Sequence, residues 1–534
     1  MSQAEGIAIA ADVLILGGGM AACWAAIAAA KAGAAVVLVD KGFVGTSGVT
    51  ATGGPNHWWV PPDPGKREAA VAERHARSLG LADPEWMLRI IKETWIALPE
   101  LAAYYPFAGD GRGGTFYSGV RGPEYMRALR HYAYDLGVRI LDHHPALELL
   151  LHRDGSVAGA AGHARLIDRA WTVRAGAVVV ATGGCAFRSG LIGSHGNTGD
   201  GLLMAAEAGA TLSGMEFSVS YSLSPAWNST RTLPYFAARF FDEAGAELDV
   251  PPPMRGEAAH LRALAAAMER GTVLADLADA PPALKQCLRQ IQPASLAPFE
   301  RRGIDLFRER FPVRLFGEGT VRGTGGLQIT GPGCETTVPG LYAAGDSATR
   351  ELVAGATSGG GAQNAAWALT SGRIAGAAAA GTARTRGRRT DDAVRPAGQA
   401  GLRPTATPRT LDLRTFLPVL QQPTIGYDTA LWRDAAKLRK GREAVEAVWR
   451  AIADHGHGNG LASVGLREHA AMAAAARWVL AAAARRTESR GMHQRTDHPG
   501  QDAGQGSRLL VGGLDEPWTR FEHAEPVVAD EIAA

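Results

Sequence analysis

Short apolar runs, most of which end at glycine, predict the strands of a parallel sheet. After the first run, the glycine turn Gly17–Gly19 leads into an alanine-rich helix over residues 20–32. Gly33 ends this helix, and the apolar run that follows completes a strand–helix–strand unit. The runs lie at residues 13–16, 35–39, 177–181 and 340–344. We expect the ends of the first, third and fourth strands to meet at one edge of the sheet.

The pattern changes in the rest of the chain. Residues 217–324 lose the strand–helix regularity and are rich in arginine, proline and aromatic residues, so we expect an inserted second domain there. Residues 382–410 have the Arg, Thr, Gly and Pro content of a linker. Two helices are predicted next, the second over residues 467–486, followed by an extended tail. The apolar face of the first helix repeats every seven residues, at Leu431, Leu438, Val445 and Ile452.

Composition narrows the class of protein. Of 534 residues, 46% are hydrophobic and 20% charged, as in a folded protein of three or four domain-sized units. The 55 basic and 53 acidic residues leave a formal net charge of +2. This balance gives no general electrostatic reason to bind nucleic acid or an anionic membrane. Charged residues also interrupt the apolar runs at residues 21–39 and 470–484, so we predict no membrane insertion.

The cysteines indicate the compartment and argue against a metal site. None of the four forms a C-x-x-C pair, and four are too few for a disulfide-built secreted protein. No basic residue precedes Lys31, so the charged start of a signal peptide is missing. We therefore expect a cytoplasmic protein without a metal ion or iron–sulfur cluster.

The first glycine turn has the form of a dinucleotide-binding fingerprint. Gly17-x-Gly19-x-x-Ala22 follows a predicted strand and opens a helix, where glycines let the backbone approach a pyrophosphate. Asp40 lies 21 residues after Gly19, at the end of the second strand, where a carboxylate can accept ribose hydroxyls. A packing turn is the alternative, but strand, helix and acid are all in place.

Further glycine-rich stretches favour FAD over a nicotinamide cofactor. They lie at residues 45–54, 181–184, 197–201 and 340–346. Each stretch by itself is more often a turn than a site. A long cofactor such as FAD, however, needs the backbone to approach it at several points, and their order along the chain fits this requirement.

These motifs resemble the flavoprotein family of fumarate reductase, succinate dehydrogenase and L-aspartate oxidase, over most of the chain. The family's TGDG stretch matches Thr198–Glu216, and its GLYAAGE motif matches Gly340–Asp346 with Asp in place of Glu. Its C-terminal ESRGxHxR motif matches Glu488–Arg495. Residues 358–375 are also similar to adenylylsulfate reductase α-subunits, flavoproteins that work with a ferredoxin-like partner.

The resemblance implies an α/β fold with a Rossmann-like FAD-binding domain, an inserted α+β capping domain and a C-terminal helical domain. It also implies hydride exchange between the flavin and a substrate. The expected boundaries are 1–216 and 325–381 for the FAD-binding domain, 217–324 for the capping domain, 382–410 for the linker, 411–500 for the helical domain and 501–534 for the tail. The residues expected to bind FAD are Gly17, Gly18, Gly19, Met20, Ala21, Ala22, Asp40, Lys41, Ser47, Thr50, Thr52, Gly53, Gly54, Ala181, Thr182, Gly183, Asp200, Asp346, Gln363 and Asn364.

Departures from the family pattern change the expected chemistry. Ser47 stands where succinate dehydrogenases carry the flavin-linked His, so we expect FAD to bind without a covalent link. The family's two substrate-binding His positions fall at Tyr221 and near Val321–Arg322, and its carboxylate-clamping Arg falls at Ser358 or Gly359. Groups that would hold a C4 dicarboxylate are thus absent or replaced, and we expect a different small-molecule substrate.

One catalytic residue of the family has a candidate here. An Arg of the capping domain exchanges the substrate proton in the family, and an ungapped alignment from Gly245 places it at Arg262. Arginine serves as a general acid only where its surroundings allow brief deprotonation. An exposed helical Arg is the alternative interpretation of Arg262, and Arg255 and Arg231 are the next candidates.

Two other clusters carry weaker hypotheses. Trp58 and Trp59 could form the wall of a planar ligand's site or pack in a domain interface. Residues 454–457 could bind a metal ion, but a polar loop between helices is the better interpretation.

Three functions therefore remain open. The first is an FAD-dependent oxidoreductase acting on a C–C or C–N bond. The second is a flavoprotein subunit that exchanges electrons with a separate ferredoxin-type or iron–sulfur protein, since this chain lacks clustered cysteines. The third is a flavin-binding subunit without turnover.

Overall fold

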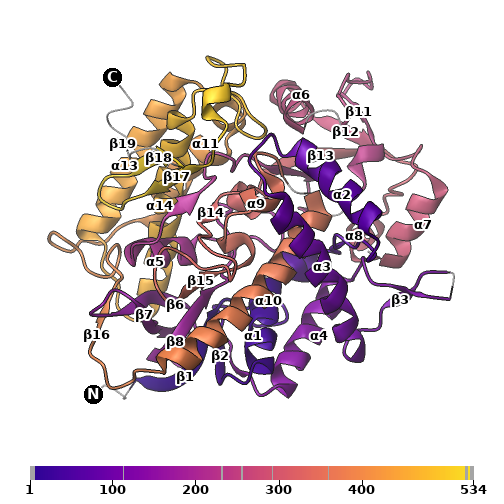
Figure 1. Cartoon of the computed structure of the whole chain (residues 1–534). Helices are drawn as coiled ribbons and strands as arrows, with labels where there is room; N and C mark the ends of the chain where they lie inside the picture. The colour runs from indigo at the N-terminus through magenta and orange to yellow at the C-terminus, as the bar shows by residue number, and fades with distance from the viewer. Residues whose placement is uncertain are drawn as a thin grey trace.

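The structure is a computed structural model that describes residues 6–111, 113–229, 233–253, 257–291, 293–358, 360–522 and 527–528. Within these ranges the largest sheet has eight strands in the order β16-β6-β7-β8-β1-β2-β5, with β15 also paired to β8. Figure 1 shows helices α1 and α10 in front of this sheet. The strands are β1 (Ile7–Leu16), β2 (Val36–Val39), β5 (Arg139–Leu141), β6 (Ala146–His152), β7 (Val157–Ala164), β8 (Arg169–Val180), β15 (Leu341–Ala343) and β16 (Val394–Pro396).

The glycine-ended strands meet as predicted. Leu16 at the end of β1 pairs in parallel with Val39 of β2 and with Val180 of β8. Val180 also pairs in parallel with Ala343 of β15. Strands buried on both faces are nearly continuous apolar runs, which is why these strands could be predicted from the sequence.

Helices α1 (Met20–Lys31) and α10 (Gly360–Arg386) pack closely on each other. A Cβ atom at Gly372 or Gly376 of α10 would lie 2.4 or 2.1 Å from the backbone oxygen of Ala21 or Ala25. Only glycine therefore permits this approach. The other helices of this part are α2 (Pro64–Arg77), α3 (Pro84–Glu100), α4 (Gly122–Asp135), α5 (Asp200–Glu207) and α9 (Glu351–Ala354), and β3 (Ala108–Gly109) pairs with β4 (Thr115–Phe116).

A second unit lies beyond the sheet, at the upper right of Figure 1. Its antiparallel sheet has the order β10-β13-β12-β11, and it has a hydrophobic core of its own that includes Leu264, Phe299 and Phe311. These elements fall within residues 217–324. They are β10 (Tyr221–Pro225), β11 (Arg239–Phe241), β12 (Val273–Asp276), β13 (Phe311–Gly317), α6 (Glu257–Arg270), α7 (Pro282–Ile291) and α8 (Pro293–Glu300).

The helical region after residue 411 contains the predicted seven-residue repeat. Leu438, Val445 and Ile452 are buried along α13 (Ala435–His455), so its apolar face is confirmed. Leu431 lies before α13, because Asp434 caps the helix, and it packs in the core of the second unit instead. The remaining helices are α11 (Leu413–Ile425), α12 (Tyr427–Ala430) and α14 (Leu461–Arg485).

The last residues differ from the extended tail that the sequence predicts. The strand β17 (Leu509–Gly512) is fully buried and pairs with β9 (Leu212–Ser213), far away in the sequence. The sheet continues through β14 (Gly326–Leu327), β18 (Trp518–Phe521) and β19 (Val527–Val528). The predicted linker also differs, since α10 extends to Arg386 and β16 pairs with β6. Pairing with distant strands leaves no periodic signal in so short a segment.

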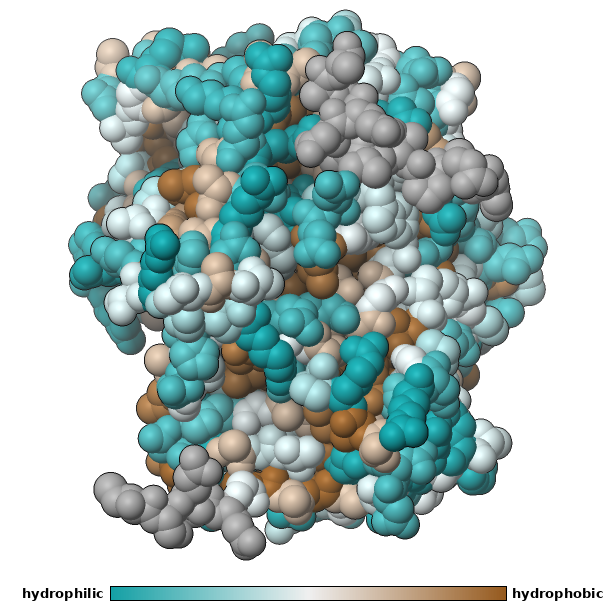
Figure 2. Space-filling model, turned by 90° about the vertical axis from the view of Figure 1, so that its left-hand side faces the viewer, coloured by the Kyte–Doolittle hydropathy of each residue, from teal (hydrophilic) through white to brown (hydrophobic). Residues whose placement is uncertain are grey.

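The surface shows no extended apolar face in the view of Figure 2. Hydrophilic side chains cover most of it, and hydrophobic ones lie mainly in its recesses. No helix in the described ranges has an apolar stretch long enough to cross a bilayer.

Candidate flavin site and adjoining cavity

A cavity of about 920 Å³ lies at the carboxyl ends of the parallel strands. Turns after β1, β2, β8 and β15 line it, together with the start of α10 and part of α7. In open α/β sheets, ligands bind at this edge. The fold therefore brings glycine-rich turns that are far apart in the sequence to one cavity.

The first turn needs its glycines for different reasons. Gly17 has a φ of +112°, and a Cβ atom there would lie 2.3 Å from the backbone oxygen of Ala181. A Cβ atom at Gly18 would lie 2.6 Å from Cγ of Asp40, whereas one at Gly19 would meet nothing within 4 Å. The turn is thus packed on its inner side and open toward the cavity, where the N-terminus of α1 favours an anionic group.

Asp40 lies at the end of β2, and its side chain is almost fully buried. Ser47 donates a hydrogen bond to its Oδ2 atom, and the backbone N–H of Gly42 donates another at 3.1 Å. Burial raises the pKa of Asp40 above its ordinary value, although these hydrogen bonds oppose the shift. The carboxyl can accept further hydrogen bonds from a ligand such as a ribose.

Lys41 ties three distant segments together beside the cavity. Its Nζ atom lies 2.7 Å from Oδ2 of Asp200, 3.1 Å from Oε1 of Glu468 and 2.8 Å from Oγ1 of Thr198. Glu468 also accepts a hydrogen bond from Arg188. Burial by itself would lower the pKa of Lys41, but the two carboxylates outweigh it and the pKa is raised. Lys41 therefore stays charged and holds α14 against the cavity.

Asp346 is held by an arginine that the sequence analysis missed. Arg350 is buried, forms an ion pair with Asp346, and donates to the backbone oxygen of Val321 at 2.9 Å. It thereby joins the turn after β15 to the end of the second unit. The spacing of four residues between Asp346 and Arg350 was the only sequence signal. Glu468 and Arg188 had none, because Glu468 comes from a helix remote in sequence.

Most residues expected to bind FAD line this one cavity. They are Gly17, Gly18, Gly19, Met20, Ala21, Asp40, Lys41, Ser47, Thr50, Gly53, Gly54, Ala181, Thr182, Gly183, Asp200, Asp346 and Asn364. Ala22 does not, because it is fully buried on the inner side of α1. Thr52 does not either, since its hydroxyl donates to Val49. Gln363 lines a different cavity.

That second cavity, of about 850 Å³, adjoins the first. The two share Leu233, Phe236 and Arg322 in their linings. It lies between the second unit, the start of α10 and the turn after α14. A ligand in the second cavity can therefore reach a cofactor in the first.

Three of the positions that the family resemblance assigns to the substrate line the second cavity, whereas Val321 lines only the first. Tyr221 contributes to the wall, but its hydroxyl donates to the backbone oxygen of Ile425 at 3.0 Å and is thereby satisfied. Ser358 is buried, and its Oγ atom has no hydrogen-bond partner. Arg322 lies 3.6 Å from the buried carboxylate of Glu318. Gly359 lies outside the described residues.

Arg262 on α6 lines the second cavity and not the first. Its Nε atom donates to the backbone oxygen of Leu431 at 2.8 Å, and its guanidinium lies over the ring of Trp432. Its Nη2 atom is buried without a partner, and burial lowers its pKa. The alternatives Arg255 and Arg231 lie outside the described residues.

The other candidate clusters are placed as follows. Trp58 is buried in the wall of the second cavity, whereas Trp59 stacks on Trp95 with ring centroids 4.1 Å apart. Asp454 and His455 bond to the segment around residues 405–407. The described part of the chain holds no group of His, Cys, Asp and Glu side chains arranged to bind a metal ion.

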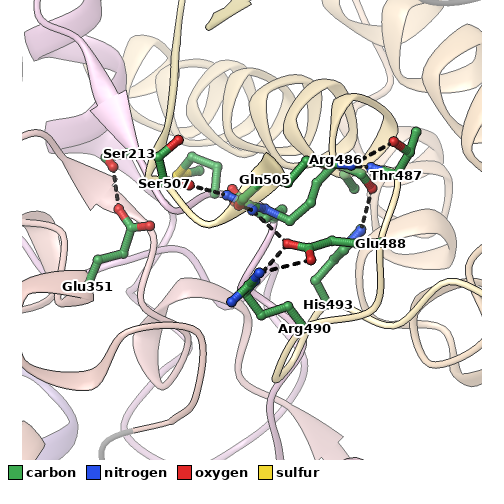
Figure 3. A network of polar contacts seen from close by, with 12 residues as sticks. Ser213, Glu351, Arg486, Thr487, Glu488, Arg490, His493, Gln505 and Ser507 are labelled. Atoms are coloured by element: carbon green, nitrogen blue, oxygen red, sulfur yellow. Dashed lines mark hydrogen bonds and ion pairs between the residues drawn. The ribbon is translucent and has the colours of Figure 1, made fainter. Parts of the chain in front are cut away.

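The ESRGxHxR motif forms a buried ionic network beside the second cavity (Figure 3). Glu488 accepts hydrogen bonds from Arg486 at 2.9 Å and from Arg490 at 2.7 Å. Arg486 also pairs with Glu216 at 2.7 Å, which ties the C-terminal region to the segment after β9. Arg490 donates to the backbone oxygen of Leu79, and Leu79 and Met492 line the cavity. The network therefore fixes one wall of the cavity.

Comparison with known proteins agrees with this geometry. The family model described as "FAD binding domain" matches residues 12–363, and the model described as "Fumarate reductase flavoprotein C-term" matches residues 422–518. The chain belongs to this flavoprotein family. The predicted resemblance is confirmed, and the protein is an FAD-dependent oxidoreductase of the succinate dehydrogenase and fumarate reductase flavoprotein family.

The individual relatives have low sequence identity to this chain. The L-aspartate oxidase of Mycobacterium tuberculosis is 28% identical over 95% of this chain and 96% of its own length. Among solved structures, E. coli quinol fumarate reductase has a TM-score of 0.77 at 20% identity, covering 98% of this chain and 99% of that one. Adenylylsulfate reductase from Archaeoglobus fulgidus has a TM-score of 0.75 at 17% identity, covering 98% and 97%. These structures confirm the predicted α/β fold class.

The first cavity suits the FAD that the family binds. Because Gly19 has no side chain and nothing lies within 4 Å of its Cβ position, the N-terminus of α1 is open toward this cavity. The Oδ1 atom of Asn364, a residue that also lines this cavity, is buried and has no hydrogen-bond partner. An orphaned polar atom of this kind is costly unless a ligand satisfies it. The family confirms the prediction that the protein binds FAD.

Proposed function

We propose that this flavoprotein exchanges a hydride between FAD and a C–C or C–N bond of a small molecule other than a simple C4 dicarboxylate. The observation that carries the proposal is the second cavity. It adjoins the flavin cavity at Arg322, and it has Tyr221 and Ser358 where the family resemblance expects cationic groups. When bound, FAD accepts or gives the hydride.

In this proposal, Arg262 holds the substrate and exchanges its proton. Burial lowers the pKa of Arg262, so its guanidinium releases a proton more readily than an exposed one does. Its Nε atom is fixed by Leu431, which leaves Nη2 for the substrate. Arg322, at the junction of the cavities, can orient a substrate between Arg262 and the flavin.

We also propose that FAD binds without a covalent link. In the structure the hydroxyl of Ser47 donates to Asp40, and a serine offers no imidazole for flavin attachment. Acid precipitation of the purified protein should leave the yellow colour in the supernatant. Colour in the pellet would contradict this part of the proposal.

The function is tested by adding succinate, and separately L-aspartate, to the oxidised protein without oxygen. We expect little bleaching of the flavin, because Tyr221 and Ser358 stand where the family resemblance expects cationic groups, and charge-assisted hydrogen bonds are about twice as strong as neutral ones. Rapid bleaching by either compound would overturn the proposed substrate choice.

A flavoprotein subunit that passes electrons to a separate iron–sulfur protein is the second candidate. The four scattered cysteines cannot form an internal relay, and all four are free. Free thiols also support our proposal of a cytoplasmic location. Reoxidation of the reduced flavin by a ferredoxin-type acceptor, faster than by air, would favour this candidate. Fast reoxidation by air with stoichiometric peroxide would favour an oxidase.

A further inference from the structure

The second cavity has a mostly apolar wall. Trp58, Tyr221, Leu223, Leu431 and Met492 come from four separate segments and line it together. Tyr221 presents only its ring, because its hydroxyl is bonded to the backbone oxygen of Ile425. A wall of this composition gains free energy by burying an apolar or aromatic body.

Three polar atoms of the same cavity lack a hydrogen-bond partner. They are Nη2 of Arg262, the hydroxyl of Tyr235 and Oγ of Ser358, each buried. Burial raises the pKa of Tyr235 well above its ordinary value, so its phenol remains a donor. Leaving three buried polar atoms unsatisfied is costly, and all three can donate a hydrogen bond to acceptor oxygens of a ligand.

The charge of Arg262 indicates the nature of that acceptor. Among the described residues, no carboxylate lies within ion-pair distance of its guanidinium, which bonds to the Leu431 carbonyl and lies over Trp432. The other arginines of this cavity wall have partners of their own. Arg77 pairs with Glu73 at 2.7 Å, Arg322 lies 3.6 Å from Glu318, and Arg74 donates to the backbone oxygens of Val353 and Ala354. A half-buried cation without a counter-charge favours an anionic ligand group.

The size of the cavity agrees with a larger molecule than a C4 acid. Its volume of about 850 Å³ lies within the range of roughly 300–1,000 Å³ found for pockets that enclose drug-sized ligands. One charged end and one apolar body are therefore both accommodated.

We infer that the substrate class is a monocarboxylate with an aromatic or bulky apolar body, whose carboxylate binds Arg262, Tyr235 and Ser358. This inference rests on the proposed function, since it assigns the substrate of the same cavity. The apolar body lies against Trp58, Tyr221 and Leu431. The carboxylate end is thereby fixed, and the carbon chain extends toward Arg322 and the flavin cavity.

Binding to the oxidised holoenzyme tests the inference without requiring turnover. The probe is 3-phenylpropanoate, compared with 3-phenylpropanol, which lacks the charge, and with succinate, which lacks the ring. Dissociation constants come from the perturbation of the flavin absorbance and from the rise in melting temperature. We expect 3-phenylpropanoate to bind at least about tenfold more tightly than either comparison compound.

Two variants locate the carboxylate, and a third is the control. Tyr235→Phe should weaken 3-phenylpropanoate binding about threefold to tenfold, and Arg262→Gln by about tenfold or more, while binding of 3-phenylpropanol changes little. The matched control is Tyr427→Phe, whose hydroxyl donates to the backbone oxygen of Leu315 at 2.7 Å outside the cavity wall. It should leave the dissociation constant unchanged.

Equal binding of the acid and the alcohol, or tighter binding of succinate, would overturn the inference. The inference would also be overturned if Tyr235→Phe and Arg262→Gln each folded and bound FAD but left the dissociation constant of 3-phenylpropanoate unchanged. Tight binding of 3-phenylpropanoate without hydride exchange in either direction, so that 3-phenylpropanoate does not reduce the flavin and cinnamate does not reoxidise it, would instead leave the inference standing and contradict the proposed function. The two failures are thus distinguishable.

Discussion

At neutral pH the carboxyl group of Glu351 keeps a proton that exposed glutamate side chains lose. Its carboxyl is fully buried and accepts a hydrogen bond from Ser213 (Figure 3), and Oε1 has no partner among the described residues. Burial, and then the charge of Glu216, raise its pKa to about 8. Arg486 bonds to Glu216 and not to Glu351, so the proton stays on Glu351.

This proton makes stability depend on pH. From pH 4.5, the ordinary pKa, up to about 8, the unfolded chain releases the proton while the folded chain keeps it, so stability falls as pH rises. Glu351→Gln resembles the protonated acid and should remove this loss. We expect the variant to gain about 3–4 kcal/mol relative to the natural protein between pH 5 and pH 8, measured by denaturant unfolding.

The same change at an exposed site provides the control. Glu73→Gln alters a surface ion pair with Arg77 and should shift stability by less than about 1 kcal/mol at either pH. If Glu351→Gln changed the stability by the same amount at every pH, Glu351 would be ionised in the folded protein.

Single residues also show where prediction from the sequence stops. Gly17 and Asp40 could be predicted because a glycine turn and an acid at fixed spacing have a local cause. Thr52 and Gln363 do not line the first cavity, because the direction of a side chain depends on packing that the sequence pattern does not contain. Arg350 and Glu468 were missed for the same reason.

At the scale of elements, α14 contributes to the cofactor cavity through Glu468. Replacing Glu468 by Gln leaves Lys41 with Asp200 as its single carboxylate in this cluster. Because the remaining cluster holds the cavity wall less firmly, FAD should dissociate about tenfold faster on dilution, measured by the rise of flavin fluorescence.

The matched control is Glu446→Gln. Glu446 pairs with Arg477 at 2.7 Å between α13 and α14 and lies outside the cavity lining. It should lower thermal stability without changing the release of FAD by more than about twofold. An equal change in both variants would mean that Glu468 acts through general stability alone.

The strand β17 makes the end of the chain part of the fold. Leu509, Leu510 and Val511 are buried, and burying each such side chain contributes about 1.5–3 kcal/mol. A chain that ends at Arg508 should therefore unfold at a clearly lower temperature than the full chain or fail to accumulate. A chain that ends at Glu522 retains β17 and β18 and should lose much less. Equal melting temperatures for the two truncated chains would contradict this role of β17.

At the scale of the whole molecule, the architecture could be predicted and the substrate could not. The strand–helix periodicity and the family motifs identified the sheet, the flavin and the inserted unit, because these depend on local patterns. The second cavity depends on α6, α10, β10 and the turn after α14 together. No segment of the sequence contains that arrangement.

The proposed hydride exchange joins the flavin to an aryl-substituted carboxylic acid that Arg262 anchors in the second cavity. The most direct measurement reduces the flavin without oxygen and then follows its reoxidation by cinnamate and, separately, by fumarate. Each oxidant gains two hydrogens across its C–C double bond, and the reduced flavin loses them. We predict faster reoxidation by cinnamate, and a loss of about 10²–10⁴-fold in Arg262→Gln with FAD retained. Faster reoxidation by fumarate, or an unchanged cinnamate rate in Arg262→Gln, would contradict the claim.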